Sequence, residues 1–261
     1  MSSVAVMASM TSVDRESVGE SALDVSAIDA PAASSSNVEP AAEALALDHL
    51  VIGATTLAEG TAWCEATLGF TPVAGGEHTF MGTHNRVFSL ASAAFPRAYL
   101  EIIAIDPKAP APGRTRWFDL DRAALQAALR RGPQLIHWVA RCADIASATH
   151  RLQAEGVEPG AAEQAQRGSL RWQIGLRPDG QRLFGGAWPT LIQWGDAHPA
   201  DAMQASGVTL ESIVVGGLPA PLAARLPASV ALDPNPDAAP IAVTLNTPRG
   251  RIDLCSQRLG N

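Results

Sequence analysis

The sequence has few cysteines, no long apolar run and no cluster of basic residues. Its three cysteines, Cys64, Cys142 and Cys255, are an odd number without close pairing, which favours a reducing compartment and a cytoplasmic location over a disulfide framework. The apolar run at residues 99–105 is interrupted by Glu101 and falls well short of the roughly 20 residues that a membrane-spanning helix needs. We therefore expect a protein that has no membrane partner.

Several motifs that carry known chemistry are also missing. The sequence contains no Walker-type phosphate loop, no Cys-x-x-Cys pair and no Gly-x-Ser-x-Gly elbow, so nucleotide hydrolysis, structural zinc and serine hydrolysis have no support. Nucleic acid is excluded as a partner because its binding calls for clustered Lys and Arg. We expect a small-molecule substrate as the partner, and a homodimer is compatible with the sequence.

The negative charge is concentrated at one end of the chain. Residues 1–44 hold seven acids against one arginine and account for nearly all of the net charge of −7. This segment is rich in Ala and Ser, and it lacks both an apolar stretch of signal-peptide length and an enrichment in Arg. We predict a disordered acidic tail over residues 1–44, followed by a nearly neutral folded part.

One pattern of strands and helices occurs twice and partly a third time. Residues 47–53 (LDHLVIG) have a counterpart at residues 135–140 (LIHWVA), and both read as buried strands. A helix-length stretch that ends before a glycine follows each, at 56–68 and 144–155. Later strands at 85–90 and 99–103, and at 170–176 and 190–194, complete the two copies. We place the first copy at residues 45–106, a Pro-rich connection at 107–131, the second copy at 132–200 and a third, partial copy at 207–256.

Each full copy places one histidine and one oxygen-bearing side chain inside apolar strands. The pairs are His49 with Glu101 and His137 with Gln193, separated by 52 and 56 residues. A buried polar group without a partner costs on the order of 2 to 7 kcal/mol, and a charge costs more, unless it is paired or bound to a metal. Imidazole, carboxylate and amide donors together suit a divalent transition metal such as Zn, Ni, Co, Mn or Fe. We therefore predict a metal site formed by these four residues.

The same residues resemble a known family. LDHLV at residues 47–51, YLEII at residues 99–103 and the pair His137 and Gln193 resemble the vicinal-oxygen-chelate superfamily and, more narrowly, its glyoxalase-like domain branch. MGTHNR at residues 81–86 and PGRTRWF at residues 112–118 resemble segments of that branch. The resemblance implies an α+β fold in which paired βαβββ modules form a curled-sheet metal cleft, with a third, partial module at the C-terminus. His49 and Glu101 would be the donors of the first module, and His137 and Gln193 those of the second.

The resemblance supports three functional hypotheses. The first is a metal-dependent lyase or isomerase that acts on a small substrate with neighbouring oxygens and uses Glu101 as ligand and catalytic base. Glyoxalase I usually has a second Glu in this set, and Gln193 cannot act as a base, so glyoxalase I activity itself is not expected. The second is an Fe(II) ring-cleaving dioxygenase with His49, His137 and Glu101 as an open triad and His84 as acid–base residue. The third is a non-catalytic ligand-binding or resistance protein of the same fold.

Further polar and aromatic residues lie near a middle strand of each copy. Arg86 or Arg171 could bind a substrate carboxylate through two parallel hydrogen bonds. His78, His150 and His198 fall in segments that read as loop or helix, and the sequence assigns them no role. The residues predicted to contact substrate are His84, Asn85, Arg86, Arg171 and Trp172.

Overall fold

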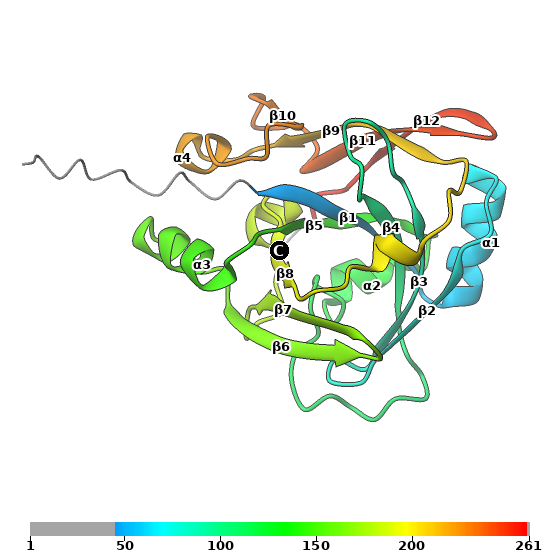
Figure 1. Ribbon diagram of the computed structural model, residues 1–261, viewed down its shortest axis with the longest axis horizontal. Helices are drawn as coiled ribbons and strands as arrows, with labels where there is room; N and C mark the ends of the chain where they lie inside the picture. Colours follow the sequence, from blue (N-terminus) through cyan, green and yellow to red (C-terminus); the bar gives the residue numbers. More distant parts are fainter. Residues whose placement is uncertain (1–44, 260–261) are drawn as a thin grey trace, which may run out of the picture. The chain divides into compact units, whose positions relative to one another are not determined.

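The computed structural model describes residues 45–259, all of which belong to one compact unit of the chain, residues 40–261 (Figure 1). The predicted acidic tail, residues 1–44, lies outside the described residues. The described part combines four α-helices with two β-sheets, one of eight strands and one of four.

The eight-stranded sheet contains both full copies of the repeat. The first copy runs β1 (Ala46–Gly53), α1 (Leu57–Leu68), β2 (Val73–His78), β3 (Thr83–Ser89) and β4 (Tyr99–Ile105). The second runs β5 (Gln134–Arg141), α3 (Ile145–Ala154), β6 (Ala161–Arg167), β7 (Leu170–Leu176) and β8 (Thr190–Trp194), with a short 3-10 turn at Leu183–Gly186 before β8. Each copy is therefore a βαβββ module, as the family resemblance implies.

The two modules join through their first strands. The strand order is β2-β3-β4-β1-β5-β8-β7-β6, with β1 antiparallel to β5 at the centre. Within each module the first strand runs parallel to the last, so β1 pairs with β4 and β5 pairs with β8. The predicted α+β fold of paired βαβββ modules is confirmed by this arrangement.

Local sequence explains where the two module helices begin and end. The side chain of Thr56 accepts a hydrogen bond from the backbone N–H of Glu59, and α1 ends at Gly69, whose φ of 73° lies in the left-handed region that glycine adopts without strain. Asp144 caps α3 in the same way through the N–H of Ser147. Both helices start and stop where the capping residues predict.

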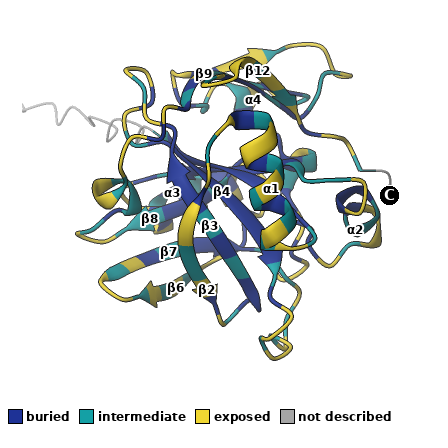
Figure 2. Cartoon of the chain, turned by 90° about the vertical axis from the view of Figure 1, so that its right-hand side faces the viewer, coloured by how far each residue is buried: buried dark blue, intermediate teal, exposed yellow. Residues whose placement is uncertain are grey.

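Different elements pack against the two faces of the eight-stranded sheet. The outer face packs against α1, α3 and the second sheet, and α1 turns its exposed residues away from the sheet (Figure 2). The inner face packs around residues of the connection between the modules. Because alternate residues of a strand point to opposite faces, each strand divides its side chains between the two. The outer face carries Leu50, Ile52, Leu100, Ile102 and Trp138, and the inner face carries Val51, Ile103, Ile136, Val139 and Ile192.

The connection between the modules is only partly a loop. It contains α2 (Ala123–Leu129), and its residues Trp117 and Phe118 are buried against the inner face. Phe118 and Asp119 both have positive φ, of 58° and 63°, a conformation that costs free energy in residues other than glycine. A buried ion pair holds this segment, since Arg182 Nε donates to Asp119 Oδ2 at 2.8 Å.

The second sheet is built from the C-terminal residues. Its strands are β9 (Thr209–Gly216), β10 (Val230–Asp233), β11 (Ile241–Thr247) and β12 (Gly250–Cys255). The short helix α4 (Ala220–Ala223) lies between β9 and β10 in the chain, and a 3-10 turn at Pro199–Ala202 precedes β9. These elements again follow the order βαβββ, but the strands are arranged β10-β9-β11-β12, so its first strand pairs with the second and third. The partial third module thus keeps the element order and changes the pairing. Among residues 45–259, no helix is long and apolar enough to cross a membrane.

Candidate active site on the inner face

Two β-bulges position the repeated histidines. In the β1–β5 pairing, Leu47 faces Ala140 and His49 faces Val139, which leaves Asp48 without an opposite residue. In the same pairing Ile136, which directly precedes His137, is also left without one. A bulge locally re-aims side chains, and here it lies one residue before each histidine. The repeated Leu-x-His motif therefore marks two equivalent bulges.

The first bulge brings a carboxylate to His49. The Nδ1–H of His49 donates to Asp48 Oδ1 at 2.7 Å, and its ring stacks on Tyr99 at a centroid distance of 4.6 Å. The opposite ring nitrogen, Nε2, lies 3.6 Å from Glu101 Oε2. Although burial opposes protonation, the hydrogen bonds and negative charges of Asp48 and Glu101 raise the pKa of His49 to about 9.

Glu101 is buried and held on both sides. Its Oε1 accepts a hydrogen bond of 2.6 Å from Asn85 Nδ2, and the amide oxygen of Asn85 accepts one of 2.7 Å from the backbone N–H of Gly76. Burial by itself would raise the pKa of Glu101, but His49 and His78, together with Asn85, lower it to about 2. The carboxylate is therefore ionised at neutral pH.

His78 is a site residue to which the sequence assigned no role. It ends β2, its Nε2 lies 4.0 Å from Glu101 Oε1, and its Nδ1 lies 3.1 Å from Thr83 Oγ1. Burial lowers the pKa of His78 to about 4, so its ring is neutral at pH 7. His78 follows Gly75 and Gly76 closely, and this glycine pair made the segment read as a loop.

Asp48 also ties a distant segment to the site. His198 Nε2–H donates to Asp48 Oδ2 at 2.9 Å, and Trp194 Nε1–H donates to the same oxygen at 3.0 Å. Asp48 is fully buried, and its pKa is lowered because the hydrogen bonds from His198 and His49 outweigh the effect of burial. Sequence reasoning passed over Asp48 and His198, although the Asp-His pair at residues 48–49 offered a signal.

The side chains of His49, His78 and Glu101 line a cavity of about 40 Å³ on the inner face. Asn85 and Trp172, which were predicted to contact substrate, lie on its wall. The remaining wall combines apolar and aromatic side chains of both modules and of the connection with Arg167, so the donors lie in largely apolar surroundings. The lining includes His49, His78, Asn85, Tyr99, Glu101, Trp117, Phe118, Arg167 and Trp172.

The second module does not repeat this arrangement. The register pairs Val51 with Glu101 in the first module and Val139 with Thr190 in the second, so Thr190 occupies the position equivalent to Glu101. His137 Nε2 accepts a hydrogen bond of 3.2 Å from the N–H of Thr190, and its ring packs against Phe118 at 5.0 Å. The pKa of His137 is lowered well below its usual value by burial, with the positive charges of Arg182 and His49 adding to the effect. His137 is not among the residues that line the cavity.

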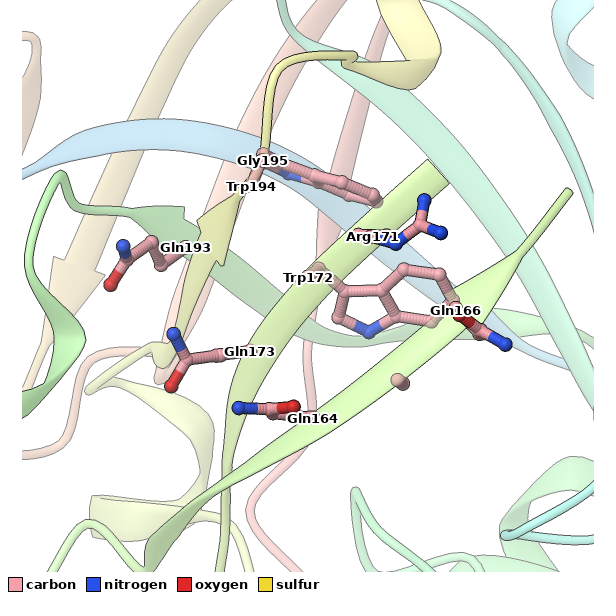
Figure 3. A pocket seen from close by; sticks show the side chains of 9 residues that line it. Gln164, Gln166, Arg171, Trp172, Gln173, Gln193, Trp194 and Gly195 are labelled. Carbon is pink, nitrogen blue, oxygen red and sulfur yellow. The ribbon is translucent and has the colours of Figure 1, made fainter. Parts of the chain in front are cut away.

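The structure places Gln193 on the outer face. Its Oε1 accepts a hydrogen bond of 2.8 Å from the N–H of Ile145 at the start of α3, and its side chain points away from that of Trp194 (Figure 3). Gln193 lines an open pocket of about 480 Å³ together with Arg171. The four residues of the sequence-derived metal set therefore do not meet. The residue of β8 that corresponds to Glu101 is Thr190, three residues before Gln193.

Two other residues that were predicted to contact substrate also point outward. His84 and Arg86 face Ala104 and Ile102 across the β3–β4 pairing, and Ile102 belongs to the outer face. His84 Nδ1 lies 3.9 Å from Asp106 Oδ1. Of the five predicted contact residues, only Asn85 and Trp172 line the inner cavity.

The donors of the first module fit a divalent cation. Two donors that share one cation through bonds of about 2.1 Å lie about 3.4 Å apart at the tetrahedral angle, and His49 Nε2 and Glu101 Oε2 are separated by 3.6 Å. Within residues 45–259 no three His, Cys, Asp or Glu side chains form a ready-made metal cluster. His78 Nε2 lies 4.0 Å from Glu101 Oε1 and 3.4 Å from Asn85 Nδ2, so a second imidazole stands beside the pair.

Comparison with known proteins identifies the family. The glyoxalase-like domain model matches residues 47–230, whereas no curated protein matches the chain. A solved structure of a hypothetical protein from Staphylococcus aureus has a TM-score of 0.50 at 14% identity, over 82% of this chain and 87% of that one. At this identity the likeness supports the fold alone.

Two solved epimerase structures show lower structural similarity. Methylmalonyl-CoA epimerase from Mycobacterium tuberculosis is 21% identical with a TM-score of 0.37, over 60% of this chain and 91% of that one. The Streptomyces coelicolor enzyme in complex with 2-nitronate-propionyl-CoA is 18% identical with a TM-score of 0.39, over 59% and 99% of the two chains. Since the family match spans more than half of the sequence and both βαβββ modules, this chain belongs to the glyoxalase-like domain family.

Proposed function

We propose that the protein is a metal-dependent lyase or isomerase that acts on a small substrate with two neighbouring oxygens. The observation that carries this proposal is the buried, ionised carboxylate of Glu101, fixed by Asn85 and facing His49 inside a cavity. Among the described residues that line the cavity, Glu101 is the only carboxylate. Burial of a carboxylate beside two imidazoles costs folding free energy, and binding of a shared cation by these groups would offset that cost.

His49, Glu101 and His78 would hold the cation. A divalent metal at these residues supplies Lewis-acid stabilisation to neighbouring oxygens of a bound substrate. Asp48 fixes the Nδ1–H tautomer of His49 and so keeps Nε2 directed toward Glu101. His78 is neutral at pH 7, so it can donate a lone pair to a cation without first losing a proton.

Glu101 is the residue to which we assign proton transfer. Asn85 fixes the carboxylate of Glu101 by donating to Oε1, and this carboxylate takes a proton from the carbon beside the substrate oxygens. In an isomerisation one proton leaves one carbon, resides on the Glu101 carboxylate and returns to the adjacent carbon, while the substrate's hydroxyl proton passes to the former carbonyl oxygen, so no co-reactant is needed. The walls formed by Trp117, Phe118 and Trp172 keep water from competing for that proton.

A second candidate function is favoured by one specific observation. His49, His78 and Glu101 are two imidazoles and one carboxylate, which is the open set that non-haem Fe(II) oxygenases use. Because Gln193 lies on the outer face, no amide of β8 fills a fourth ligand position. An Fe(II) ring-cleaving dioxygenase is therefore the alternative to test.

Metal content tests the proposed site. We expect close to one transition-metal ion per chain in the wild type and a loss of at least tenfold in metal affinity in His49→Ala and Glu101→Gln. His137→Ala and Gln193→Ala are matched controls that should keep their metal, because neither residue lines the cavity. Equal metal content in all five proteins would remove the site.

Turnover separates the functions. The Mn, Ni, Zn and Fe(II) forms are supplied with hemithioacetals, 2-hydroxy ketones and catechols, with and without oxygen. Oxygen-independent turnover of a 2-hydroxy ketone, lost in Glu101→Gln, is the expected result. Oxygen uptake coupled to catechol cleavage by the Fe(II) form would establish the dioxygenase instead. Tight binding without turnover in any form would identify a ligand-binding protein.

A further inference from the structure

Arg167 brings a positive charge to the cavity from the far edge of the sheet. It is the last residue of β6, and its guanidinium reaches the cavity wall that His78 and Tyr99 share. The side chain lies against the backbone of Gly76 in β2, where an added Cβ would come within 2.4 Å of its Cδ. The two edge strands of the curled sheet, β2 and β6, therefore approach one another through this arginine.

The cavity wall contains two unpaired hydrogen-bond donors. Within residues 45–259, Arg167 Nη1 and Trp117 Nε1 are both buried and have no hydrogen-bond partner. Trp117 is 5% exposed, and both residues line the cavity that contains Glu101. Because a buried donor without an acceptor destabilises the folded chain, two such donors on one wall indicate a place for a ligand that accepts hydrogen bonds.

The formal charges around the cavity favour an anion. With a divalent cation bound and His49, His78 and His198 neutral, Glu101 on the cavity wall and Asp48 behind His49 together balance the cation. Arg167 then leaves one positive charge in largely apolar surroundings. A ligand with a single negative charge would neutralise it.

We propose that Arg167 and Trp117 form an anion subsite that selects substrates bearing a carboxylate beside the two neighbouring oxygens, an inference that rests on the proposed function of the site. The planar guanidinium matches a carboxylate through paired hydrogen bonds, and the indole N–H adds one more. Arg86 and Arg171, which the sequence pointed to for this role, belong to the outer face and cannot serve it.

Two matched hydroxamates test the subsite. Butyrohydroxamate offers neighbouring oxygens to the metal, and succinomonohydroxamate differs from it only in a carboxylate that replaces the terminal methyl group. Dissociation constants are measured by calorimetry on the zinc-loaded full-length chain. We expect the wild type to bind succinomonohydroxamate at least tenfold more tightly, since a charge-assisted pair of hydrogen bonds is stronger than a neutral one.

Variants assign that preference to residues. Arg167→Gln should lose most of the preference for the carboxylate compound. Trp117→Phe should lose roughly fivefold of it, because it removes one uncharged hydrogen bond. The outer-face control Arg171→Gln should keep all of it. Melting temperature verifies that each variant is folded.

The possible failures are distinguishable. If butyrohydroxamate fails to bind the zinc-loaded wild type, the proposed metal function fails and the subsite with it. If butyrohydroxamate binds and the carboxylate adds nothing, or if Arg167→Gln keeps the preference, only the subsite is overturned.

Discussion

Asp48 shows how much one bulged residue controls. Without an opposite residue in β5, its carboxylate turns to meet His49, His198 and Trp194 at once. A buried carboxylate with three donors is stable only while all three are present. The protonation state of His49 therefore depends on its chain neighbour, and this dependence can be measured.

The metal-free protein should lose stability as pH rises above neutrality. The pKa of His49 is about 9 in the folded chain and 6.5 in the unfolded chain, so its contribution is complete below pH 6.5 and is lost as pH rises through 9. Urea unfolding of the chelator-treated chain should give roughly 2 kcal/mol less stability at pH 8.5 than at pH 6.5. In Asp48→Asn this slope should flatten, because the pKa of His49 falls. The surface variant Asp121→Asn should retain the slope, and a flat wild-type profile would contradict the assignment.

The site could be predicted from sequence only where a polar residue interrupts an apolar strand. His49 and Glu101 stand out for that reason, and the structure brings them together. Thr190 did not stand out, because a threonine is ordinary in a strand, and sequence spacing carries no information about register. Gln193 was the more conspicuous residue, but it lies on the opposite face.

Among the elements, β2 departs most from its sequence-based description. Its pairing with β3 has a register shift between Ala74 and Glu77, so Gly75 and Gly76 together stand opposite Asn85. The absence of side chains there lets Asn85 and Arg167 lie directly against the backbone. A Gly-Gly pair reads as a turn in sequence, yet here it forms a bulge that brings His78 to the site. The helices were easier to predict because their caps are local.

Gly75→Ala should disturb Glu101 without touching it. An added Cβ would come within 2.0 Å of Asn85 Oδ1, which is too close for any contact, so Asn85 must move and release its hydrogen bond to Glu101. We expect a loss of about 1 to 3 kcal/mol in stability and a severalfold loss in metal affinity. Gly195→Ala, where the nearest atom is 3.4 Å away, is the control that should change neither. Unchanged metal affinity in Gly75→Ala would show that Asn85 does not position the carboxylate.

Across the whole described part of the chain, the fold follows the duplicated pattern, whereas the chemistry does not. The connection breaks the symmetry, because Trp117 lies against His78 in the first module and Phe118 against His137 in the second. Periodicity and capping revealed the repeat. The asymmetry depends on tertiary packing of two aromatic residues that the sequence shows only as part of a connection.

Asp119→Ala should loosen this connection. The buried ion pair with Arg182 holds Phe118 and Asp119 at positive φ, and removal of one partner leaves a buried charge unpaired. We expect a loss of about 3 to 5 kcal/mol in the free energy of unfolding, with a red shift in tryptophan fluorescence as Trp117 becomes exposed. Asp121→Ala, which removes only a partly exposed partner of Arg116, is the matched control. Equal stability of the two variants would show that the connection is held by its aromatic contacts alone.

The two bulges also bear on how the sequence can change over generations. In the second module, Ile136 and Thr190 occupy the positions that Asp48 and Glu101 occupy in the first module. Their roles are packing and hydrogen bonding. A gene duplication that leaves one half with the chemistry frees the other half to drift. Sequence variation among descendants should therefore concentrate at residues 136 and 190 and spare residues 48 and 101.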